Sequence, residues 1–263
     1  LLGRLEDAAY NLVCGKNNGD DYGGLDINRD TKDEVEALIT QFPRILSRTQ
    51  TFVDTIYWPI EMIPILYYDD HIARVRTYRY NNVHALPFLP LVARLGVQLG
   101  QFTEHQRGGL LLNNRHGYNI LQEIALENPN EIKYNDLLSK QKLDVLKELR
   151  EISLLRKEDI KEFGLLGGMC HSCKFPDNAK QRFKFLLKLD PDALAYPGRL
   201  GQLPLHVAAC SSMQSFQFVF EAGIRTFPNT KGIHFLFRKS PSHYTPFKSA
   251  CRSFNLGRDA TMK

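Results

Sequence analysis

The stretch GRLGQLPLHVAAC, Gly198–Cys210, contains the signals that decide the fold. Its glycines suit a tight turn, and Pro204 suits the first position of a helix, where its missing N–H is harmless. Beyond it, four apolar residues fall at helical spacing: Met213, Phe216, Val219 and Phe220. Gly223 is expected to end this second helix in a left-handed turn. The stretch therefore predicts a short helix, a tight turn and a longer helix.

The same pattern recurs along the chain. HYTPFKSAC, His243–Cys251, repeats its first half, and weaker copies are YWPIEMIPIL (57–66), GYNILQEIA (117–125) and GLLGGMC (164–170). The residues equivalent to Pro204 are Pro59, Ile120, Leu165 and Pro246. We call these five positions the anchors. Second helices are expected at about 88–96, closed by Gly96, at about 140–155 and at 179–189.

These repeats predict the domain organisation. We expect about five degenerate helix–turn–helix units in a single domain, residues 31–263, and an all-α fold class. An amphipathic helix at Val35–Phe42 precedes the first full unit and should stop near Pro43. Residues 1–30 are expected to hold a helix at Leu5–Val13 and a flexible loop rich in Gly, Asn and Asp.

The pattern resembles that of ankyrin-repeat proteins. Pro204–Ala209 matches the end of the ankyrin motif T-P-L-H-x-A, and Thr245–Ala250 matches it with Lys248 in place of the histidine. The anchors lie further apart than in the usual unit of about 33 residues, as in the long-spacer ankyrin-like families that are numerous in diatoms. The resemblance is most specific over 163–256.

The resemblance implies a solenoid with long inter-repeat loops or hairpins, which generally binds proteins and is generally not catalytic. It also implies that Leu205 packs inward. His206 would bond neighbouring backbone and so brace the turns between units. Because stacked units bury a continuous core, their loops line up along one edge, where a partner can bind.

Composition sets broad limits. The 263 residues are 43% hydrophobic and 24% charged, as in an ordinary globular protein. The formal net charge of +5 is compatible with an acidic partner, nucleic acid or anionic lipid, or with a role in solubility alone. Five cysteines, an odd count, favour a reducing, intracellular compartment. The sequence begins at Leu1 and not at Met, so we expect its true start to be missing. It stops after the first helix of its last unit, so either something else caps the fold or the chain is truncated there.

Two predicted loops, 69–82 and 230–244, are rich in arginine and aromatic residues, the types that dominate interface energies. With the arginines of two matching loops, the predicted partner-binding residues are Arg74, Arg76, Tyr78, Arg79, Tyr80, Arg115, Arg199, His234, Phe235, Arg238, Lys239 and Tyr244. Such an edge suits an acidic or phosphorylated protein. An alternative stays open for each loop. The Arg/Tyr alternation in 69–82 is a half-solvated strand, and GIHFLF (232–237) is a hairpin arm that closes the local core.

Three other motifs suggest chemistry. Cys170 and Cys173 form a C-x-x-C pair that suits zinc or redox chemistry, but the repeat register places Cys170 and Cys251 in a small buried slot. Asp26 is the first residue of a calcium-like loop that lacks the required glycine and final glutamate. A helix that is capped by Asp30 or Thr31 accounts better for the acidic residues of this stretch. Ser240-Pro241 is a candidate phosphorylation site.

We therefore expect a non-catalytic, intracellular protein-interaction scaffold that needs no cofactor and no metal. Three alternatives remain. The chain is a fixed subunit of a larger complex, it binds nucleic acid or another anionic partner through its basic loops, or it is an enzyme with Cys173 as nucleophile and His171 as base.

Overall fold

The computed structural model describes residues 2–15, 17–18, 21–52, 55–68, 78–113, 117–126, 136–171, 176–198 and 200–259. Most of these residues are helical, which confirms the predicted all-α class in its broad sense, and their strands form three short antiparallel hairpins. The chain divides into two compact units. The first comprises Leu1–Ile124 and Lys133–Leu155, and the second comprises Ala125–Ile132 and Arg156–Lys263. The domain boundary expected at residue 30 stays a prediction.

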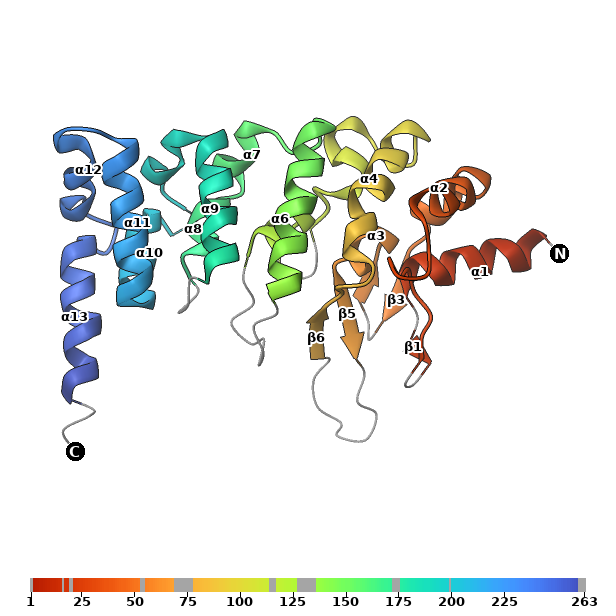
Figure 1. The fold of residues 1–263 in the computed structure, drawn as a ribbon, viewed down its shortest axis with the longest axis horizontal. Coiled ribbons are helices and arrows are strands. Elements are labelled where there is room, and N and C mark those ends of the chain that lie inside the picture. The colour runs from red at the N-terminus through yellow and green to blue at the C-terminus, as the bar shows by residue number, and fades with distance from the viewer. Residues whose placement is uncertain are drawn as a thin grey trace. The chain divides into compact units, whose positions relative to one another are not determined.

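The first unit is built around one helix, α4 (Leu89–Gln98), which packs against α2, α3, α6 and η3 (Figure 1). The other helices are α1 (Leu2–Cys14), α2 (Lys32–Gln41), η1 (Pro43–Leu46), α3 (Pro59–Met62), η2 (Leu86–Phe88), η3 (Glu104–Gly109), α5 (Ile120–Ala125) and α6 (Asp136–Glu151). The hairpins pair β1 (Asn17–Asn18) with β2 (Asp21–Tyr22), β3 (Gln50–Phe52) with β4 (Thr55–Tyr57), and β5 (Ile65–Tyr68) with β6 (Tyr78–Asn81). The helix predicted at 5–13 is α1, and it packs against α3 and η1.

The second unit consists of helix pairs. Its elements are α7 (Lys157–Glu162), α8 (Leu165–Met169), α9 (Asp177–Leu189), η4 (Pro191–Ala195), α10 (Pro204–Ser211), α11 (Met213–Thr226), α12 (Thr230–His234), η5 (Phe235–Phe237) and α13 (Pro246–Asp259). Helix α10 packs against α8 on one side and α13 on the other, and α11 lies antiparallel to it (Figure 1). The hydroxyl of Ser211 donates a hydrogen bond to the Cys170 carbonyl, 2.7 Å away, and so joins the ends of α10 and α8.

All five anchors are the first residues of helices: α3, α5, α8, α10 and α13. In three of them the third helical residue accepts a hydrogen bond from the backbone N–H that precedes the helix. The acceptors are Glu61 (2.8 Å), Gln122 (3.0 Å) and His206 (3.2 Å). These side chains satisfy an N–H that has no partner within the helix, so three of the five units share a capping device.

Two predicted helix stops are wrong. Gly96 lies inside α4, which continues to Gln98, and a Cβ there would lie 2.9 Å from the Phe102 ring, so this glycine allows close packing. Gly223 lies inside α11, which continues to Thr226, and a Cβ there would lie 3.7 Å from the Phe235 ring, an ordinary contact. Gly100, with φ +64°, supplies the left-handed turn after α4.

The segment 230–244, predicted as a loop or as a hairpin arm, is largely helical instead. Its first half forms α12 and η5. A Cβ on Gly232 would lie 2.8 Å from the backbone of Ile224, so the glycine lets α12 cross α11 closely. The ring of Phe235 packs edge-on against Phe227, with centroids 5.1 Å apart. Packing against α11 therefore holds the first half of this segment in place, while most of the segment's side chains stay exposed.

Candidate functional site

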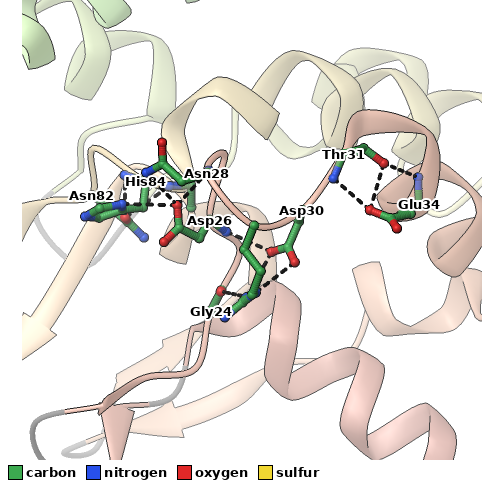
Figure 2. A network of polar contacts seen from close by, with 10 residues as sticks. Gly24, Asp26, Asn28, Asp30, Thr31, Glu34, Asn82 and His84 are labelled. Carbon is green, nitrogen blue, oxygen red and sulfur yellow. Dashed lines mark hydrogen bonds and ion pairs between the residues drawn. The ribbon is translucent and has the colours of Figure 1, made fainter.

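The carboxylates of the calcium-like loop at Asp26–Asp30 accept hydrogen bonds from other groups of the fold (Figure 2). Asp26 Oδ1 accepts from the backbone and the side-chain amide of Asn28, at 2.9 and 3.1 Å, and lies 3.2 Å from His84 Nδ1. Asp30 accepts from its own neighbour Arg29 and from the backbone N–H of Asp26. The loop is thereby attached to the turn that contains His84.

These contacts favour the ionised carboxylates. The Asn28 N–H holds the pKa of Asp26 below its usual value, and the Arg29 guanidinium does the same for Asp30. Thr31 caps α2 and exchanges hydrogen bonds with Glu34, which confirms the predicted helix start. Within the described ranges, no group of three His, Cys, Asp or Glu residues could hold a metal ion. The loop is a structural brace.

The cysteines divide into buried and exposed ones. Cys170 is buried as predicted, its thiol donates to the Leu166 carbonyl, and burial raises its pKa. Cys251 is exposed, so its predicted buried slot is wrong: Ala250 points into the core instead. Cys173, the second residue of the C-x-x-C pair, lies outside the described residues.

His206 has the role that the resemblance implies. Its Nδ1 accepts from the Leu203 N–H at 3.2 Å, and its Nε2 lies 3.1 Å from the Tyr244 carbonyl, in the turn that leads into α13. The ring is therefore neutral, with the proton on Nε2, and its burial lowers its pKa. Both ring nitrogens are occupied, so His206 joins successive helix pairs and is not available as a general base.

The predicted partner-binding residues fall into three groups. Arg74, Arg76, Arg115 and Arg199 lie outside the described residues. Tyr78, Arg79 and Tyr80 lie in β6, opposite β5, so they form a short strand, while the solvation of one of its faces stays a prediction. The other five lie in the second unit: His234, Arg238 and Lys239 are exposed, while Phe235 and Tyr244 are half-buried. Ser240 is buried, which makes it unsuitable as a phosphorylation site.

The structure adds four residues to that last group. The rings of Phe237 in η5 and Phe247 in α13 lie beside each other, with centroids 6.5 Å apart, and are 61% and 53% exposed. Lys248 Nζ lies 5.2 Å and the Arg252 guanidinium 5.8 Å from the centre of the Tyr244 ring. We call seven of these nine residues the C-terminal basic surface: Phe237, Arg238, Lys239, Tyr244, Phe247, Lys248 and Arg252.

Phe247 departs from the repeat pattern. It directly follows an anchor, and the residues at that position in the other units are all buried: Ile60, Leu121, Leu166 and Leu205. A position that packs inward in four units is half exposed in the fifth. Exposed aromatic side chains grouped on a surface are typical of protein-binding sites.

The charge of this region is one-sided. Residues 222–258 contain seven of the chain's 34 Lys and Arg and none of its 29 Asp and Glu. Within the part of the chain that the structure describes, no carboxylate pairs with Arg238, Lys239, Lys248 or Arg252. Other cations do have such partners: Arg225 pairs with Glu221, and Arg94 with Glu36. The absence of acidic residues along 222–258 is the sequence signal that could have found this surface.

Comparisons with protein-family models, curated proteins and solved structures found no match to this chain. No helix among the described residues is long and apolar enough to cross a membrane.

Proposed function

We propose that this chain is a non-catalytic scaffold of ankyrin-like helix pairs that binds another protein through its C-terminal basic surface. Three observations support the ankyrin-like part. The five anchors begin helices, α10 packs between α8 and α13, and His206 links one helix pair to the turn before the next. Stacked pairs of this kind present surfaces for partners and need no cofactor.

The single observation that carries the binding function is the exposed Phe237–Phe247 pair beside cations that have no acidic partner in the described residues. Large apolar side chains supply most of the energy of a protein interface when they are buried, and nearby charges set its orientation and specificity. The predicted arginine-rich segment at Arg74, Arg76 and Arg79 remains a second candidate edge of the same scaffold.

Affinity capture from native lysate, compared between variants, tests this function. We expect the wild-type chain to retain a defined set of proteins that the double variant F237A/F247A loses. The matched control is L2A/L5A, because Leu2 and Leu5 are exposed apolar residues of α1 in the other unit. Circular dichroism of each variant checks its fold. An identical set of captured proteins for F237A/F247A and the wild type would contradict the proposal.

A further inference from the structure

The positive charges of the C-terminal basic surface form an ordered pair on α13. Lys248 and Arg252 are one helical turn apart, which corresponds to a rise of about 6 Å. Both lie near the Tyr244 ring, and one guanidinium N–H donates to the Tyr244 hydroxyl at 3.1 Å. The ring therefore positions the two side chains in advance. Within the described part of the chain, the bond to Tyr244 is the one hydrogen bond of the Arg252 guanidinium, whose planar set of five N–H donors suits a carboxylate.

The apolar part of the surface shares helix α13 with this pair, through Phe247. Phe247 precedes Lys248 in the chain, and the Phe237 ring is tilted by 41° to the Phe247 ring. Two neighbouring exposed rings offer apolar area to one large side chain. An occupant of the whole surface therefore needs negative charge and one apolar anchor close together.

We infer that the C-terminal basic surface binds an extended acidic segment of a partner protein, in which alternate carboxylates follow a large apolar residue. The inference rests on the proposed function and specifies the partner's chemistry. Alternate side chains of an extended chain point the same way and are about 6.7 Å apart, close to the rise between Lys248 and Arg252. The partner's apolar residue would lie on Phe237 and Phe247.

The same surface suits nucleic acid less well. Proteins that bind single strands present several stacking platforms along a basic groove, so that successive bases find a ring each. Here the two exposed rings face each other in one place. A single apolar side chain of a partner protein can contact both rings, whereas successive bases of a strand each need a separate ring.

Fluorescence anisotropy tests the inference with a labelled peptide of 12 residues. The peptide carries one phenylalanine, then glutamate at every second position after it, with serine at the positions between. We expect saturable binding at low salt that weakens as salt rises, because the exposed charges are screened. Replacing every glutamate by glutamine should weaken binding about ten-fold or more, and replacing the phenylalanine by serine about three-fold or more.

Protein variants locate the binding. K248E/R252E should weaken the parent peptide about ten-fold or more. The control K140E/K184E reverses two exposed lysines, on α6 and α9, and should change the affinity less than about two-fold. F237A/F247A should weaken binding of the parent peptide by the same factor as replacing the peptide's phenylalanine by serine.

Four results would overturn the inference. Two concern the peptide: the parent peptide shows no saturable binding, or K248E/R252E binds it as tightly as the wild type does. The third is that a 12-nucleotide oligothymidine binds at least as tightly as the peptide. The fourth is that the chain self-associates in sedimentation experiments and that F237A/F247A abolishes this self-association. Any of these would leave the proposed function standing if F237A/F247A still lost captured proteins other than copies of the chain itself. Failure of that capture experiment is therefore a separate result.

Discussion

The Asp26–Asp30 loop and the C-terminal basic surface both concentrate charge, and they differ in what that charge contacts. The loop's carboxylates accept hydrogen bonds from Asn28 and Arg29, and Asp26 also lies against His84 (Figure 2). The cations around Tyr244 pair with no carboxylate of the described residues. A charged side chain that is satisfied within the fold contributes to stability, whereas one without a counter-charge on an exposed surface is available to a partner. Residue types alone do not make this distinction.

The largest effect on stability should come from a buried polar group that the fold satisfies completely. We expect H206A to lower the free energy of unfolding by about 3 kcal/mol, because it leaves the Leu203 N–H and the Tyr244 carbonyl without their partner. Urea denaturation followed by circular dichroism measures it. The matched variant H206Q should lose clearly less, because Gln122 makes the equivalent capping bond in α5. Equal losses in the two variants would refute the bracing role.

A smaller loss is expected at the acidic loop. D26A removes the acceptor for both Asn28 donors, and we expect it to cost about 1 kcal/mol, since the carboxylate is partly exposed. The control D144A changes an exposed aspartate of α6 and should stay within about 0.5 kcal/mol of the wild type. Added calcium should leave the melting temperature of the wild type unchanged. A calcium-dependent rise would show that the loop binds the ion.

The pH dependence of the free energy of unfolding gives a further test of the bracing role of His206. Burial lowers the pKa of His206, so the folded protein binds a proton at this site less readily than the unfolded chain does. Its stabilising contribution is complete above pH of about 6.5, the ordinary histidine value, and is lost as the pH falls through the lower pKa of the folded state. Urea denaturation at pH 7 and pH 5 should show this loss in the wild type and a smaller loss in H206Q. The same loss in both would assign the effect to other groups.

The smallest effect on stability is expected at the C-terminal basic surface itself. K248A/R252A should change the free energy of unfolding by less than about 0.5 kcal/mol, because the removed groups are exposed and pair with no carboxylate among the described residues. Thermal denaturation measures this change. A loss as large as that of D26A would mean that these cations support the fold, and the contrast between the two regions would fail.

Local signals in the sequence predicted much of this fold. The five anchors begin helices and Thr31 caps α2, since proline, capping side chains and helical spacing act within a few residues. The stop at Gly223 was wrong, since α11 continues through it to Thr226. The stop at Gly96 was also wrong, because this glycine serves a contact with a segment further along the chain. Such close approaches leave no local trace in the sequence.

The candidate site was predicted only in part. Arg238, Lys239 and Tyr244 were identified from their residue types and are on the C-terminal basic surface. Phe247 and its neighbours were missed, because the motif assigns that position to the interior, as Leu205 illustrates. Whether a side chain at a repeat position is covered depends on what packs over it. The spacing of apolar residues does not contain that information.

A charge swap tests the central claim most directly, because it asks whether Lys248 and Arg252 contact the partner's carboxylates. The measurement is the affinity of K248E/R252E for the 12-residue peptide in which lysine replaces every glutamate. We predict that this variant binds the lysine peptide at least about ten-fold more tightly than the wild type does, reversing the order seen with the glutamate peptide. Equal affinities of the two proteins for the lysine peptide would contradict the account.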